Sequence, residues 1–200
     1  MKDIARLLVA LTLIASISGL ILAQVEQVTR EPIKEQRRLQ MLKALDAVLP
    51  EYDNSPDQDT VSVESGVDTK DQPIETIFYR ARKQGELVGT AFTIVAPNGY
   101  SGNIAVMIGI LPNHTVNAIE ILNHAETPGL GDKIEEPWFK EMFAGKELDH
   151  TDWRVKKDGG DFDQLTGATI STRAVVDAVA RGLKLYRDKR AKIHSKGVNP

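Results

Sequence analysis

The sequence contains no cysteine and no excess of basic residues, and each absence excludes classes of function. Without cysteine the chain cannot form disulfides, thiolate nucleophiles, zinc–thiolate sites, cysteine-bound iron–sulfur clusters or thioether haem attachments. Lysine and arginine number 25 against 28 aspartates and glutamates, a net charge of −3, so binding to nucleic acid has little electrostatic support. We expect no nucleic-acid partner, and any redox chemistry must use a cofactor held by other groups.

Aromatic residues are also few, at 6%, while hydrophobic residues make up 42% of the 200 residues. This composition is typical of one folded domain with a small appendage, and it excludes a large multidomain enzyme. The histidines show no second ligand at helical or hairpin spacing, so no metal site is expected. They are His114, His124, His150 and His194.

One long uncharged run lies near the N-terminus, from Leu7 to Ala23. As a helix it would span roughly 26 Å, close to the thickness of a bilayer's hydrocarbon core, so we expect a retained single-pass anchor. The alternative is a cleaved signal peptide, because Lys2 and Arg6 precede the run. That alternative is weaker, because the run exceeds a usual signal core and Ile21 occupies a position where cleavage after Ala23 requires a small residue.

Basic residues lie on both sides of the apolar run, so charge alone does not orient it. Long domains translocate largely regardless of charge, and we therefore expect the short N-terminus inside and the long C-terminal part outside. The basic residues that follow the run are Arg30, Lys34, Arg37 and Arg38.

The rest of the chain shows helical and strand patterns in turn. Apolar residues at helical spacing predict an amphipathic helix over residues 33–49, ending at Pro50. Residues 51–72 are polar with little apolar periodicity, so we expect a long loop there. Four strand-like runs and two helices follow, at Ile74 to Ala81, Leu87 to Val95, Ile104 to Leu111, Thr115 to Leu122, Glu135 to Ala144 and Ser171 to Lys189. The pattern predicts an α+β fold, an antiparallel sheet covered by helices, after a transmembrane helix.

Residues 156–172, KKDGGDFDQLTGATIST, have the features of an anion site. Small residues precede the last predicted helix, whose N-terminus offers unpaired N–H groups and a partial positive charge. Lys156 or Lys157 could compensate the negative charge of an anionic ligand. The alternative is that Thr169 or Ser171 only caps the helix and Asp163 closes a turn.

The heptad Asp163-Gln164-Leu165-Thr166-Gly167-Ala168-Thr169 resembles the Asp-x-x-Ser/Thr-Gly-Ala-Ser/Thr signature at which a flavin transferase esterifies FMN phosphate onto the last hydroxyl. Further blocks at residues 99–102 (GYSG) and 126–133 (ETPGLGDK) occur in the same order as in the FMN-binding family. With the N-terminal anchor, most of the chain resembles the G subunits of Rnf (Rsx) ion-translocating electron transport complexes. The C subunits of sodium-translocating NADH:quinone reductases are related.

The resemblance implies a covalently flavinylated electron carrier that does not turn over a physiological substrate alone and has no catalytic acid, base or nucleophile. It implies FMN attached through Thr169, a membrane complex of six subunits as partner, a flavin transferase during maturation, and contact with lipid. It places the FMN domain on the periplasmic side of the bacterial inner (cytoplasmic) membrane. The expected organisation is an anchor over residues 1–30, a helix and polar loop over 31–72, the extracytoplasmic FMN-binding domain over 73–190, and a tail over 191–200.

Two segments carry the cofactor residues that the resemblance implies. The attachment segment supplies Asp163, Thr166, Gly167, Ala168 and Thr169, with Lys156 and Lys157 before it. The loop expected beside the flavin ring supplies Glu126, Thr127, Pro128, Gly129, Leu130 and Gly131. Trp138 and Phe139 could shield the ring, and His124 could tune it, but packing and a solvated loop are the more ordinary roles.

Two other classes of function remain open at this point. One is a membrane-anchored binding or scaffold module without redox role, in which the threonines only cap a helix. The other is a free-standing anchored flavoprotein reductase.

Overall fold

The computed structural model describes residues 2–67 and 72–195, which divide into two compact units, residues 2–41 and residues 42–195. The first unit consists of helix α1 (Lys2–Val48), which continues into the second. The apolar side chains of the first unit are exposed, and the helix is long and apolar enough to cross a membrane. The Thr12 hydroxyl donates to the Leu8 carbonyl at 2.8 Å, so this polar group is satisfied within the helix, as a lipid environment requires.

The expected anchor and the expected amphipathic helix are parts of this one helix, and Pro32 lies inside it. The predicted end is nearly correct, because α1 ends at Val48, two residues before Pro50. Proline disfavours helical backbone in the residue that precedes it.

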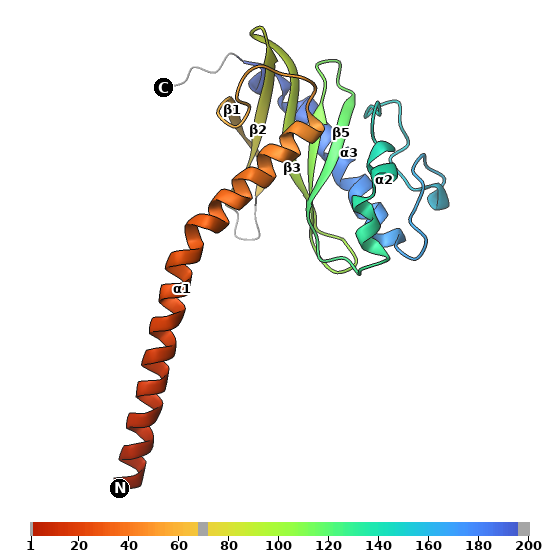
Figure 1. Ribbon diagram of the computed structural model, residues 1–200. Coiled ribbons are helices and arrows are strands. Elements are labelled where there is room, and N and C mark those ends of the chain that lie inside the picture. The colour runs from red at the N-terminus through yellow and green to blue at the C-terminus, as the bar shows by residue number, and fades with distance from the viewer. Residues whose placement is uncertain (1, 68–71, 196–200) are drawn as a thin grey trace. The chain divides into compact units, whose positions relative to one another are not determined.

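The folded unit contains a five-stranded antiparallel sheet in the order β1-β2-β3-β4-β5, coloured from orange to green in Figure 1. The strands are β1 (Thr60–Val67), β2 (Pro73–Lys83), β3 (Glu86–Ala96), β4 (Ile104–Ile110) and β5 (Val116–Asn123). The predicted meander is therefore confirmed, with four of its strands at nearly the expected positions. Phe78, Phe92, Ile108 and Ile119 pair in sequence across four strands and are all buried, so one continuous apolar row fixes the register.

Strand β1 corrects the expectation of a loop over residues 51–72. It pairs with β2 from Thr60 opposite Tyr79 to Val67 opposite Pro73, with a bulge between Glu64 and Gly66. Val63 is buried, and Val61 packs against the core from the same face of the strand. The alternation of these valines with Ser62 and Glu64 was the signal for an edge strand, hidden by the polar composition around it.

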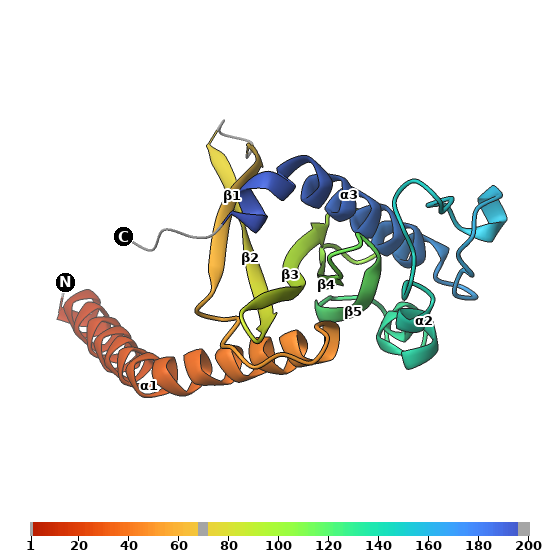
Figure 2. The ribbon, with the colours of Figure 1, turned by 90° about the horizontal axis from the view of Figure 1, so that it is seen from above.

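Helix α3 (Thr169–His194) lies along one face of the sheet, as Figure 2 shows. It begins two residues earlier and ends five residues later than predicted, and its buried stripe includes Val175, Val179 and Leu183. Residues 44–49 pack on the opposite face, where the Val48 carbonyl accepts a hydrogen bond from the Asn117 amide at 2.8 Å.

Short helical segments fill the connection between β5 and α3. They are η1 (Gly131–Glu135), α2 (Pro137–Glu141) and η2 (Lys156–Asp158). Helix α2 is shorter than predicted and has Pro137 at its first turn, where the missing N–H costs nothing. The connection returns the chain to the sheet edge at β5, so that the loop after β5 and the start of α3 meet.

Candidate functional site

A cavity of about 560 Å³ lies at the N-terminus of α3, within the size range of small-molecule and cofactor sites. Four segments that are distant in sequence form it: the loop after β3, the loop after β5, η2 and the first turn of α3. The lining residues are Tyr100, Glu126, Thr127, Leu130, Gly131, Lys157, Gly167, Ala168, Thr169, Ile170 and Ser171.

The first turn of α3 presents an uncapped N-terminus to this cavity. No side chain accepts a hydrogen bond as the N-cap, a position held by Ala168. The Thr172 hydroxyl accepts from the Leu165 N–H at 3.1 Å and donates to the Ala168 carbonyl at 3.2 Å. In the described part of the chain, the Thr169 hydroxyl has no hydrogen-bond partner. The alternative that Thr169 or Ser171 only caps the helix is therefore wrong.

Glu126 is the charged group that the fold buries in the wall of the cavity, with 5% of its surface exposed. One carboxylate oxygen accepts from the Ser101 N–H at 3.0 Å, and the other accepts from the Ser171 hydroxyl at 2.5 Å. Its own N–H donates to Nδ1 of His124 at 3.0 Å, while Nε2 of that ring bonds Glu135 at 2.9 Å. His124 therefore orders the loop and does not line the cavity.

The loop after β5 closes through main-chain hydrogen bonds. The N–H groups of Leu130 and Gly131 donate to the Thr127 carbonyl at 3.2 and 3.0 Å. Gly129 has a φ of +76°, which favours glycine, and its N–H donates to Asp132 at 2.9 Å. A Cβ on Gly131 would lie 2.8 Å from a carboxylate oxygen of Glu126, so only glycine fits there.

The two predicted lysines have different surroundings. Lys156 pairs with Asp163 at 2.8 Å on the exposed surface, whereas Lys157 lines the cavity. The segment around Lys157 is held to α3 by an ion pair of Arg173 with Asp158 at 2.7 Å. Hydrogen bonding to the Arg173 guanidinium lowers the pKa of Asp158.

The structure thus brings most of the predicted cofactor residues together. Eight line the cavity: Glu126, Thr127, Leu130, Gly131, Lys157, Gly167, Ala168 and Thr169. The others lie outside the lining: Pro128, Gly129, Lys156, Asp163 and Thr166. Sequence reasoning missed Tyr100, Ile170 and Ser171, although the first lies in the GYSG block and the other two follow the attachment motif.

The aromatic residues after the loop have packing roles. Phe139 is fully buried and meets Phe143 edge-to-face, with ring centroids 5.6 Å apart. Trp138 is 47% exposed, meets Phe139 edge-on, and is not part of the cavity lining. Shielding of a ligand by these two side chains therefore finds no support.

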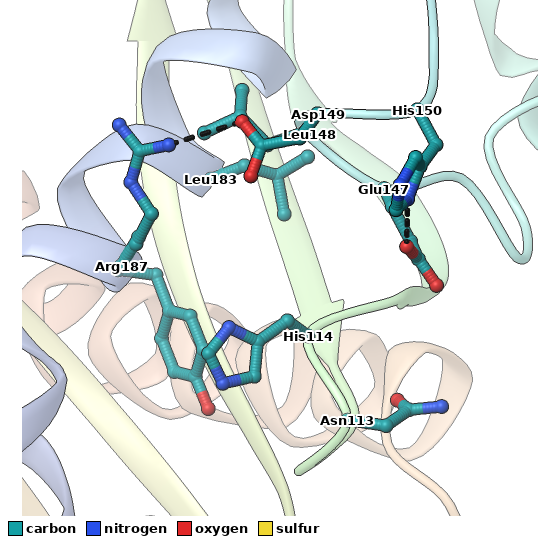
Figure 3. A pocket seen from close by; sticks show the side chains of 9 residues that line it. Asn113, His114, Glu147, Leu148, Asp149, His150, Leu183 and Arg187 are labelled. Carbon is teal, nitrogen blue, oxygen red and sulfur yellow. Dashed lines mark hydrogen bonds and ion pairs between the residues drawn. The ribbon is translucent and has the colours of Figure 1, made fainter.

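A second cavity, of about 330 Å³, lies beside the C-terminal half of α3 (Figure 3). His114 and Tyr186 line it, and two ion pairs stand at its walls, Arg187 with Asp149 at 3.1 Å and His150 with Glu147 at 2.7 Å. It contains none of the residues that the sequence motifs predicted. In residues 2–67 and 72–195, no three His, Cys, Asp or Glu side chains form a group suited to a metal ion.

Residues 99–184 match the family of FMN-binding domains, so the fold and the cavity belong to an FMN-binding domain. All the cavity-lining residues fall within this range. The chain belongs to the family of G subunits of ion-translocating oxidoreductase complexes. It is 38% identical to the G subunit of Shewanella baltica over 94% of this chain and 92% of the relative, and 41% identical to that of Escherichia coli over 90% of each.

Solved structures share the fold at lower identity. NqrC of Shewanella oneidensis matches with a TM-score of 0.50 and 19% identity, covering 72% of this chain and 70% of that one. The C subunit of the Na⁺-translocating NADH-quinone reductase of Parabacteroides distasonis matches with a TM-score of 0.52 and 17% identity, covering 76% of this chain and 81% of that one. At this identity the likeness concerns the fold.

Proposed function

We propose that this chain is a covalently flavinylated electron-carrier subunit of a membrane complex that couples electron transfer to ion translocation. Its FMN is esterified through the phosphate to Thr169. The observation that carries the proposal is the Thr169 hydroxyl, which lies in a cavity of the FMN-binding domain, at an uncapped helix N-terminus, and makes no hydrogen bond to the described residues.

The cavity fits the chemical groups of FMN. A phosphodiester keeps a negative charge, which the N-terminus of α3 and the cation of Lys157 would stabilise. Tyr100, Leu130 and Ile170 supply apolar surface for a flat ring system, and each is at least 44% exposed in the protein alone. Bound FMN supplies the electron-transfer chemistry, while the protein supplies position and electrostatics.

The partners follow from family membership. The relatives are named as subunits of an ion-translocating oxidoreductase complex, so this chain joins other subunits, six in total in our proposal. A flavin transferase loads Thr169 during maturation. Helix α1 anchors the chain in lipid of the inner membrane, and the FMN domain lies on the periplasmic side.

The test is the mass and in-gel flavin fluorescence of denatured protein purified from its own host. Denaturation removes loosely held flavin. Wild type should carry the mass of one attached FMN and fluoresce, and Thr169→Ala should do neither. Thr93→Ala, which removes a hydroxyl from β3 outside the cavity lining, is the matched control and should keep the flavin.

Bare wild-type protein from a host that makes the transferase would contradict the proposal and favour a membrane-anchored binding or scaffold module without redox role. Flavin retained in Thr169→Ala would move the attachment to another hydroxyl. Co-purification with several hydrophobic subunits would contradict a free-standing anchored reductase.

A further inference from the structure

Glu126 joins three of the segments that form the flavin cavity. Its carboxylate accepts from Ser101 in the loop after β3 and from Ser171 in the first turn of α3. Gly99 and Gly131 approach it so closely that a Cβ on either would lie 2.7 or 2.8 Å from a carboxylate oxygen. The fold therefore builds a dedicated, tightly packed position for this side chain.

The Glu126 side chain also carries a negative charge, and this charge does not itself take part in electron transfer. Both oxygens of Glu126 act as acceptors from donors that the fold supplies, which is the pattern of an ionised carboxylate. The adjacent N-terminus of α3 stabilises negative charge. A buried charge in a cavity is poorly screened by water, so it acts strongly on any neighbouring group that gains electrons.

We propose that the negative charge of Glu126 keeps the reduction potential of the attached flavin low. This inference rests on the proposed function. A fixed negative charge in the cavity wall opposes the addition of electrons to the flavin, and the hydrogen bonds from Ser101 and Ser171 hold that charge in one place. The effect requires no proton transfer and no contact beyond the shared cavity.

The experiment is a spectroelectrochemical titration, at pH 8, of full-length protein purified in detergent with its flavin attached. Glu126→Gln removes the charge and keeps the shape, so its midpoint potential should shift to a less negative value. Glu136→Gln makes the same change of net charge at an exposed position outside the cavity and should leave the potential unchanged.

Ser171→Ala provides the second arm. It keeps the carboxylate but removes the hydroxyl donor that partly neutralises it, so the midpoint potential should become more negative. A merely structural role predicts shifts of the same direction in Glu126→Gln and Ser171→Ala, because both variants alter the same contact between residues 126 and 171.

The outcomes separate this inference from the function on which it rests. Wild-type protein without flavin refutes the proposed function. Flavinylated Glu126→Gln with an unchanged or more negative potential overturns the role of Glu126. If Glu126→Gln fails to fold or to load flavin, Ser171→Ala decides, and an unchanged or less negative potential in that variant overturns the role.

Discussion

Three hydroxyl side chains in the first turn of α3 have three different environments. Ser171 and Thr172 are fully buried. The Ser171 hydroxyl donates to Glu126, and the Thr172 hydroxyl accepts from the Leu165 N–H and donates to the Ala168 carbonyl. Thr169 is only partly buried and faces the cavity. The fold thus leaves the Thr169 hydroxyl available for modification, because the hydroxyls of Ser171 and Thr172 are already hydrogen-bonded to other residues.

At the other end of the same helix, a single histidine makes stability depend on pH. Burial, followed by the positive charges of Arg190, His114 and Arg80, lowers the pKa of His194 below its ordinary 6.5. The unfolded chain then binds more protons than the folded one in the window below pH 6.5. The contribution of His194 to stability is therefore present above pH 6.5 and is lost as the pH falls through the lowered pKa.

We predict that His194→Gln reduces the loss of thermal stability between pH 7.5 and pH 5.5. Glutamine can keep a hydrogen bond to the Tyr186 hydroxyl, which lies 2.8 Å from Nε2 of His194. The measurement is the melting temperature of full-length protein in detergent at both pH values. His150→Gln is the control, because Glu147 raises the pKa of the exposed His150, and its removal should not reduce the acid loss. Equal acid losses in wild type and His194→Gln would contradict the prediction.

At the level of the elements, the sheet and the helices packed on it hold in place the loops and the helix end that form the cavity. Helix α3 packs on one face through Val175, Val179 and Leu183, while residues 44–49 cover part of the other. The second contact depends on close approach of two backbones, because a Cβ on Gly109 of β4 would lie 1.9 Å from the Val48 carbonyl oxygen. A main-chain oxygen cannot rotate away as a side chain can, so glycine is required there.

We predict that Gly109→Ala lowers the free energy of unfolding by about 3 kcal/mol, because the end of α1 must move off the sheet. The hydrogen bond from Asn117 to Val48 would be lost or lengthened as well. Urea denaturation in detergent measures the change. Gly66→Ala is the matched control, because a Cβ there meets no atom within 4 Å. Similar stability losses in the two variants would contradict the close-approach argument.

For the whole molecule, the two units differ in the solvent they require. Residues 2–40 are exposed throughout, and their apolar run has no protein cover in the described structure, whereas the second unit buries a continuous core. Exposed apolar surface on this scale is stable in lipid and unfavourable in water. The apolar run of the first unit is thus suited to a membrane, and the second unit has the buried core of a domain that folds in water.

We predict that the protein stays in the membrane fraction after carbonate extraction with its N-terminal residues intact. The intact mass of the purified chain should match 22.0 kDa plus any attached flavin. A mass that lacks the residues up to about Ala23, together with release by carbonate, would show a cleaved signal peptide. Protease added to spheroplasts should digest the FMN domain, because we propose that it lies on the periplasmic side. Protection of that domain would place it in the cytoplasm instead.

The sequence by itself determined the features that depend on neighbouring residues. The apolar run, the four strand-like runs, the amphipathic stripe of α3 and the small residues before its first turn are local patterns. They predicted the anchor, four strands, the last helix and the anion site. The family blocks predicted most of the cavity, including Glu126, Lys157 and Thr169.

Only the tertiary structure decided which distant groups meet. It selected Lys157 over Lys156 for the cavity, made β1 an edge strand within a polar stretch, and placed Ser101 and Ser171 on the two oxygens of Glu126. Ser101 and Ser171 lie far apart in sequence, so no local pattern links them. Their meeting depends on the sheet register and on the packing of α3, because these fix where the loops between strands and helices converge.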